Sequence, residues 1–268
     1  CLKMKKPLTT GTARIAQWQP APRPDWLLHV NTEGHCLDIQ GIVPIHSASL
    51  LAMASANTGG LEDFGDDDWR EPFELMVAAI EQEAELNLMG RIMARSDLLN
   101  WLENRLLVEE TYRLHPEIED EKIEAPVFIT GLPRSGTSIL FELLAQDEEV
   151  RVPQSWEAMF PCPPPERATY RDDPRIDLAD KRLTQWNRVT PEFQSMHEMG
   201  GRIPCECLSL MNHSFISDQM SSLHQVPSYD RWLAQADMSP AYRYHKRLLK
   251  LLQWRCPGRW LLKAPSHL

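Results

Sequence analysis

The stretch FITGLPRSGTSILFELL, residues 128–144, contains residues whose types and spacing could bind an anion. Gly131 and Gly136 permit a sharp turn and a close approach of the backbone to a ligand. A helix predicted to open after Gly136 would add its positive end to a row of backbone N–H groups. Arg134 offers a planar guanidinium that suits two oxygens of a phosphate or sulfate. The pattern predicts an anion-binding loop; the alternative is an ordinary tight turn between a strand and a helix.

The residues after the last glycine indicate which anion this loop suits. A loop that serves ATP carries a lysine directly after this glycine, followed by a Ser or Thr that binds magnesium. Here the two positions hold Thr137 and Ser138, and no strand-terminal Asp is evident as a metal partner. The hydroxyls of Ser135, Thr137 and Ser138 can donate further hydrogen bonds. The loop therefore favours an anion held without a metal, by arginine and backbone donors.

The segments around the loop predict a parallel sheet. Residues 125–131, APVFITG, form a short apolar run that is typical of a buried parallel strand. The next segment, SILFELLAQ, is predicted to be a helix with an apolar side made of Ile139, Leu140, Leu143 and Leu144. VRVP, residues 150–153, is predicted as a second strand, and RWLLK, residues 259–263, as a later one. Strand, loop, helix and strand make one βαβ unit, so we expect an α/β fold.

Helices are predicted before the sheet begins. Asp68 and Glu71 have the spacing of a capping box at the start of an amphipathic helix. A second helix is predicted to begin at Ser96 or Asp97.

These elements predict two regions. Residues 1–120 would form an N-terminal arm and helical region, in which residues 1–58 are an extended arm with one short helix near SASLLAMAS. Residues 121–268 would form the α/β core, with a helical insert at about residues 155–256.

Composition limits the class of protein. The chain has 268 residues, 43% of them apolar, and a formal net charge of −10, which argues against a nucleic-acid binder. No run approaches the ~20 apolar residues of a membrane span. Six irregularly spaced cysteines fit a reducing compartment, and we expect a cytoplasmic protein. A homo-oligomer is left open.

The two ends of the chain suggest a fragment. It begins at Cys1 rather than at Met, and it stops in RWLLKAPSHL, which is predicted to be a strand and the start of a loop. We therefore expect a α/β core that is incomplete at its C-terminus.

The chain resembles the sulfotransferases that use 3′-phosphoadenosine 5′-phosphosulfate. Their loop reads Pro, Lys or Arg, Ser, Gly, Thr, and Thr or Ser, and Pro133–Ser138 match it position for position. The resemblance is greatest to the bacterial branch and covers about residues 60–268. The segments that carry it are GLEDFGDDDWREPFE, VRVPQSWEAMFPCPPPE, HEMGGRIPCECLSLMNHSF, YDRWL and RWLLKAPSHL.

The resemblance implies a three-layer fold of the P-loop type shared with nucleotide kinases, with a parallel sheet flanked by helices. It implies transfer of a sulfuryl group to a hydroxyl on a small molecule, lipid or sugar. It also implies that the 5′-phosphosulfate is gripped by Arg134, Ser135, Gly136, Thr137 and Ser138. The family's 3′-phosphate site would lie beyond residue 268.

The reaction needs a cation and a base. Lys263, at the end of a predicted strand, resembles the strand-end lysine of the cytosolic branch; a lysine simply emerging from the sheet edge is the alternative. For the base, Glu157 lies in the region where the tyrosylprotein branch places a catalytic glutamate, and His267 follows Lys263 by four residues. His197, Glu198 and Glu206 are further polar residues of the insert, each suited to packing, capping or acceptor contact.

Two other functions stay open from the sequence. One is an ATP-dependent small-molecule kinase on the same fold, which Thr137 disfavours. The other is a catalytically idle protein whose loop only holds a nucleotide.

Overall fold

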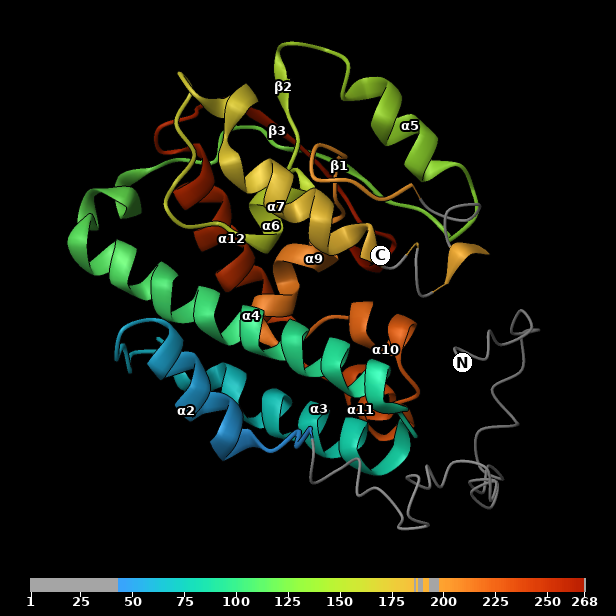
Figure 1. Ribbon diagram of the computed structural model, residues 1–268. Coiled ribbons are helices and arrows are strands. Elements are labelled where there is room, and N and C mark those ends of the chain that lie inside the picture. Colours follow the sequence, from blue (N-terminus) through green and yellow to red (C-terminus); the bar gives the residue numbers. More distant parts are fainter. Residues whose placement is uncertain (1–42, 186, 188–189, 193–197, 268) are drawn as a thin grey trace, which may run out of the picture.

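The computed structural model describes residues 43–185, 187, 190–192 and 198–267, so most of the predicted arm at residues 1–58 lies outside the described residues. A group of helices lies on one side of the molecule and an α/β layer on the other, and the long helix α4, Leu88–Leu114, runs between them (Figure 1).

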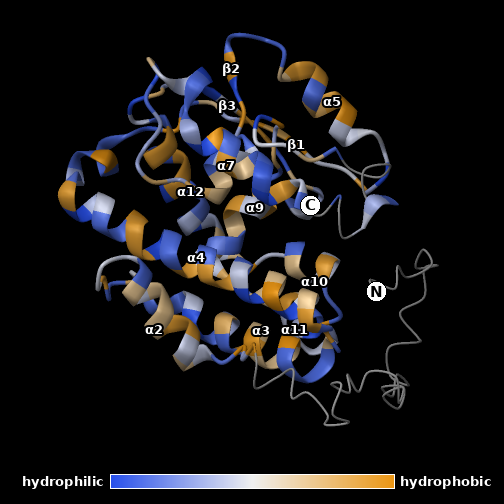
Figure 2. Cartoon of the chain, viewed as in Figure 1, coloured by the Kyte–Doolittle hydropathy of each residue, from blue (hydrophilic) through white to orange (hydrophobic). Residues whose placement is uncertain are grey.

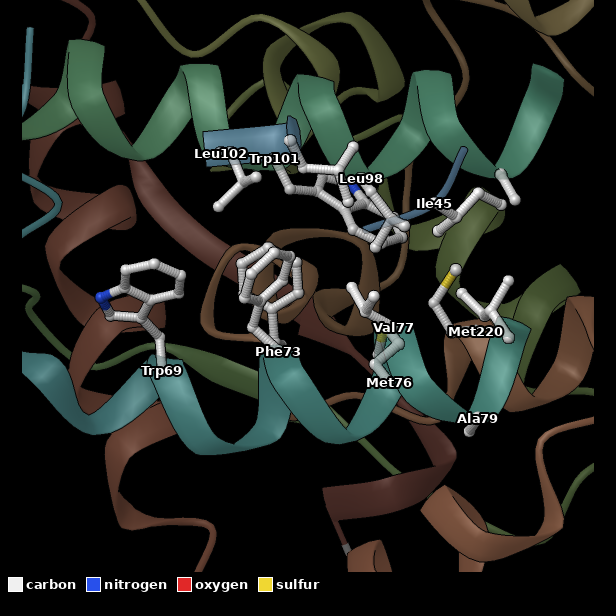
Figure 3. Packing of buried hydrophobic residues seen from close by; sticks show 14 of the residues in the cluster. Ile45, Trp69, Phe73, Met76, Val77, Ala79, Leu98, Trp101, Leu102 and Met220 are labelled. Carbon is white, nitrogen blue, oxygen red and sulfur yellow. The ribbon is translucent and has the colours of Figure 1, made fainter. Parts of the chain in front are cut away.

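The helical group is built around one apolar core. Its helices are α2 Ser47–Asn57, α3 Arg70–Glu83, α4, α10 Gln219–Leu223 and α11 Pro227–Leu233. α2 packs on α4, and α11 packs on α3. Figure 3 shows the side chains of Phe73, Met76 and Val77 on α3 facing those of Leu98 and Trp101 on α4. Because apolar residues recur every three or four positions, each helix buries one face.

This core joins the first 120 residues to the insert. Phe215, Met220, Val226 and Tyr229 belong to the same buried cluster as the N-terminal helices. Phe215 lies 5.0 Å from Phe73 between ring centroids. The predicted division at residue 120 stays a prediction, and the shared core means that the two regions fold against each other.

A buried arginine connects the segments around this core. Arg105 on α4 is 1% exposed and donates hydrogen bonds to the carbonyl of Phe64 at 2.7 and 3.0 Å and to that of His213 at 2.8 Å. Its guanidinium lies 4.2 Å from the ring centroid of Tyr244. One side chain thus holds the loop before α3, the insert and α12 together.

The sheet is parallel, as predicted. Its strands are β1 Val127–Ile129, β2 Val150–Arg151 and β3 Arg259–Lys263, in the order β1-β3-β2. Val127 pairs with Leu261, and Val150 pairs with Arg259.

The central strand β3 is covered on both faces, which confirms the predicted α/β arrangement. Trp260 and Leu262 pack with α12, Ser239–Gln253, while Leu261 packs on the other face with Phe141 of α5. A strand that is buried on both faces needs a continuous apolar run, and WLL supplies it.

The remaining elements lie mostly between β2 and β3. The helices are α6 Ser155–Met159, α7 Pro174–Leu183 and α9 Cys207–Met211, and the 3₁₀ turns of the described chain are Asp67–Trp69, Pro116–Asp120, Tyr170–Asp172, Asn212–Ser214 and Pro265–His267. Within the described residues, none of the helices has both the length and the apolar character needed to cross a membrane.

The predicted caps of both helices were wrong. α3 begins at Arg70 without a side-chain cap, and Asp68 instead pairs with Arg243 of α12 at 2.9 Å. α4 begins at Leu88, where the side chain of Asn87 accepts a hydrogen bond from the amide of Gly90 at 2.8 Å. Asp68 thus pairs with a distant helix and does not cap α3, and α4 is capped by Asn87 rather than by Ser96 or Asp97.

Ser96 and Asp97 lie inside α4. Both bind Arg182 of α7, at 3.0 Å from the hydroxyl of Ser96 and 3.3 Å from the carboxylate of Asp97. These side chains therefore fasten α7 to α4 and do not cap a helix.

The predicted apolar side of the helix after the loop was also wrong. α5, Thr137–Leu144, buries Phe141 and exposes Ile139, Leu140, Leu143 and Leu144, by 64, 46, 66 and 43%. The helix is oriented so that Phe141 packs on Leu261 of β3. In Figure 2, α5 lies beside the strands at the periphery of the molecule.

Replacing Arg105 by leucine should destabilise the fold strongly. The carbonyls of Phe64 and His213 would lose their buried donors, at a cost of about 3 kcal/mol in the free energy of unfolding. Urea denaturation measures this loss. The control Arg113→Ala removes an arginine whose side chain is 65% exposed, and should change stability by no more than about 0.5 kcal/mol. Equal losses in the two variants would contradict the role given to Arg105.

Candidate functional site

The predicted loop lies between β1 and α5 and contains two left-handed residues. Arg134 has φ 68° and Gly136 has φ 93°. The amide and the hydroxyl of Ser135 both donate to the carbonyl of Leu132, at 3.2 and 2.6 Å, and close a tight turn. The hydroxyl of Ser135 is therefore engaged within the loop in this structure.

The loop directs unpaired amides outward. Across the described residues, the amides of Arg134, Gly136, Thr137 and Ser138 donate to no protein acceptor. The last two belong to the first turn of α5, where N–H groups have no partner within the helix. Such a row of free donors at a helix start attracts negative charge.

A side chain at Gly131, where the loop begins, would crowd the neighbouring loop residues. A Cβ at Gly131 would lie 3.1 Å from Cγ2 of Thr137 and 3.3 Å from the hydroxyl of Ser135. The chain therefore folds back closely on itself, which gathers the donors into a small area.

Lys263 reaches the loop from the neighbouring strand. It is the last residue of β3 and pairs in register with Ile129, the last residue of β1. Because parallel strands end at the same sheet edge, its side chain comes to the start of α5. The ammonium lies 3.2 Å from the hydroxyl of Ser138, and the side chain is 3% exposed.

Glu206 forms an ion pair with Lys263. It stands directly before α9, and its side chain makes no capping hydrogen bond to that helix. The carboxylate is 28% exposed, so it forms the outer side of the pair. The sequence allowed packing, capping or acceptor contact for Glu206, and at a separation of 57 positions from Lys263 no sequence pattern predicts the pair.

His267 lies at the same edge of the sheet, in the 3₁₀ turn after β3. Its Nδ1 is 2.7 Å from the hydroxyl of Tyr242, and its ring meets the ring of Phe128 edge-on at 5.2 Å. Burial lowers the pKa of His267, and the nearby Glu206 opposes this effect. The imidazole is held between two aromatic side chains.

Glu157 is placed differently. It is fully buried, and its carboxylate accepts hydrogen bonds from Arg151, from the amide of Gln154 at 3.0 Å and from the hydroxyl of Tyr170 at 3.0 Å. Burial raises the pKa of Glu157, and the charge of Arg151 opposes the rise. The guanidinium of Arg151 in turn lies 4.2 Å from the ring centroid of Trp260, near the beginning of β3.

The role of Glu157 as base stays a prediction, and its contacts weigh against it. Three donors already occupy the carboxylate, and its partner Arg151 is close to the end of β3 opposite Lys263. These contacts bind β2 to α6, which is a structural function.

No group of three or more His, Cys, Asp or Glu side chains within the described parts of the chain is arranged to bind a metal ion. The arrangement that the structure does bring together is the loop, Lys263, Glu206 and His267. The free amides and Lys263 could bind an anion. Glu206 and His267 are groups that can accept or donate a proton.

Replacing Glu157 by alanine should unfold the protein more easily rather than remove a base. The buried Arg151 would lose its charge partner, which costs about 3–5 kcal/mol in the free energy of unfolding. Chemical denaturation measures the loss. The control Glu166→Ala breaks an exposed pair with Arg255 and should cost less than about 1 kcal/mol. Native stability of Glu157→Ala, together with lost turnover, would instead support the role as base.

Comparison with known proteins gives consistent matches. A profile of the Sulfotransferase family matches residues 126–268. The crystal structure of sulfotransferase STF1 from Mycobacterium tuberculosis H37Rv is similar at a TM-score of 0.72 and 36% identity, covering 83% of this chain and 61% of that one. Sulfotransferase STF9 from Mycobacterium avium has a TM-score of 0.71 and 32% identity, covering 83% and 57%.

The chain thus spans about six tenths of the length of these two solved proteins. No curated protein gives a significant sequence match. The profile covers more than half of the chain, and both solved sulfotransferases share its fold at over 30% identity. The chain therefore belongs to the sulfotransferase family.

Proposed function

We propose that the protein moves a sulfuryl group from 3′-phosphoadenosine 5′-phosphosulfate to a hydroxyl on a small molecule, lipid or sugar. The observation that carries the proposal is the position of Lys263. The loop has Thr137 where an ATP-binding loop has lysine, and a lysine from β3 reaches the start of α5 instead. Family membership supports the same reaction class.

In this proposal the loop residues 134–138 hold the 5′-phosphosulfate. The free amides of Arg134, Gly136, Thr137 and Ser138, the hydroxyls of the last two and the guanidinium of Arg134 supply donors to its oxygens. Donors that are fixed before the reaction stabilise the charge that develops during transfer. Lys263 would add a positive charge beside the loop, where its ammonium lies 3.2 Å from the hydroxyl of Ser138.

The acceptor hydroxyl must lose a proton during the transfer. His267 lies near the proposed transfer site, but its Nδ1 faces Tyr242 and its Nε2 is buried without a partner among the described residues. Glu157 is enclosed by other contacts. Both stay predictions for the base.

The cysteines fit a reducing, cytoplasmic location, which is also part of the proposal. The cysteines of the described chain, Cys162, Cys205, Cys207 and Cys256, are free thiols. Burial raises the pKa of Cys162 and of Cys207 to about 12, which keeps these two thiols protonated.

The full-length protein should bind adenosine 3′,5′-bisphosphate in preference to ATP with magnesium. The loop lacks the lysine and the metal-binding arrangement that ATP uses, and it offers arginine and amides in their place. Isothermal titration with each nucleotide tests this expectation. Tighter binding of ATP with magnesium would favour the kinase alternative, and binding without any turnover would favour the idle one.

Arg134→Ala should weaken the binding of adenosine 3′,5′-bisphosphate by roughly 1.5–3 kcal/mol, the contribution of hydrogen bonds to a charged group. The same titration gives the dissociation constant. Arg113→Ala is the matched control because Arg113 is exposed and pairs with Glu110 at the far end of α4. Unchanged affinity in Arg134→Ala would show that this guanidinium points away from the ligand.

A further inference from the structure

Three side chains from distant parts of the sequence meet beside the loop. Lys263 contacts Ser138 at the start of α5 on one side and Glu206 at the start of α9 on the other. Lys263 is 3% exposed, whereas Glu206 is 28% exposed. A molecule that approaches the loop from solvent therefore meets the carboxylate of Glu206 outside the buried ammonium.

The side chain of Glu206 has one hydrogen-bond partner among the described residues, Lys263. Its Oε1 pairs with Lys263, and in the part of the chain that the structure describes its Oε2 has no hydrogen-bond partner. Glu157 has three donors on its carboxylate, and Nε2 of His267 is buried. Unlike Glu157 and His267, the two candidates for the base named from the sequence, Glu206 combines contact with the lysine beside the loop and a carboxylate oxygen without a hydrogen-bond partner among the described residues.

We propose that Glu206 is the general base for the acceptor hydroxyl, an inference that rests on the proposed sulfotransfer function. The acceptor O–H bond breaks, and its proton passes to the Glu206 carboxylate. The electron pair of that oxygen forms the new bond to sulfur. The bond between sulfur and the bridging oxygen of the donor breaks, and its electron pair stays on the 5′-phosphate of adenosine 3′,5′-bisphosphate. Protonated Glu206 then returns its proton to water.

The pair with Lys263 gives this proton transfer a second consequence. A carboxylate that becomes neutral attracts the ammonium less, so Lys263 is released toward Ser138 and the leaving phosphate. Negative charge thus disappears from Glu206 in the same step in which it grows on the phosphate. Lys263 therefore stays next to a negative charge throughout the reaction.

The test compares full-length wild type with Glu206→Gln. Release of adenosine 3′,5′-bisphosphate from 3′-phosphoadenosine 5′-phosphosulfate is measured with phenol, ethanol or water as acceptor. We expect kcat of Glu206→Gln to fall roughly 10²- to 10⁴-fold. The dissociation constant of adenosine 3′,5′-bisphosphate should stay within about threefold, because the loop is unchanged.

Two further variants complete the design. Glu206→Asp keeps a carboxylate and should recover part of the rate, while Glu71→Gln, at an exposed glutamate on α3, should behave like wild type. Thermal unfolding of each variant checks that the fold is kept.

The outcomes separate the two proposals. Wild type that neither releases the bisphosphate nor prefers it to ATP overturns the proposed function, and the role of Glu206 falls with it. Active wild type with an equally active Glu206→Gln overturns the role of Glu206 alone. A rate loss in Glu206→Gln that is matched by an equal loss of bisphosphate affinity would make Glu206 a tether for Lys263, and would also overturn its role as base.

Discussion

An ammonium group at 3% exposure is costly unless negative charge or hydrogen-bond acceptors surround it. Lys263 meets this constraint at the end of the central strand, where Glu206 and the hydroxyl of Ser138 are its partners. The requirement ties the start of α5 to the start of α9, a helix of the insert that is distant from α5 in the chain. It also leaves the site ready for an anion, because a bound phosphosulfate would present the same ammonium with further negative charge. The resting structure and the proposed reaction therefore depend on the same electrostatic balance.

The sequence predicted well what depends on neighbouring residues. The apolar runs at β1 and β3 and the glycines of the loop are local signals, and the structure has the corresponding elements. Features that depend on distant partners were missed. Asp68 has the spacing of a helix cap, but pairing with Arg243 was favoured over capping. The apolar residues of α5 were assigned to its buried side, yet the position of β3 selected Phe141 as the buried residue.

The site also contains one part that local sequence predicts and one part that depends on distant residues. The loop could be predicted from Pro133–Ser138 because the same consecutive residues set its backbone conformation and its anion-binding groups. Its function stays a proposal. A general base has no such local signature, since any carboxylate qualifies by type and only its surroundings decide its role. Glu157 has the right chemistry, but Arg151, Tyr170 and the Gln154 amide occupy it. Glu206 became a candidate only when the fold placed it against Lys263.

Helix α12 links the stability of the molecule to the geometry of this site. Arg243 and Arg247 pair with Asp68 and Glu109 of the helical group, at 2.9 and 2.8 Å. The same helix packs on α9, holds the inner face of β3 and places Tyr242 on His267. Arg243 and Arg247 of α12 thus hold the helical group in place.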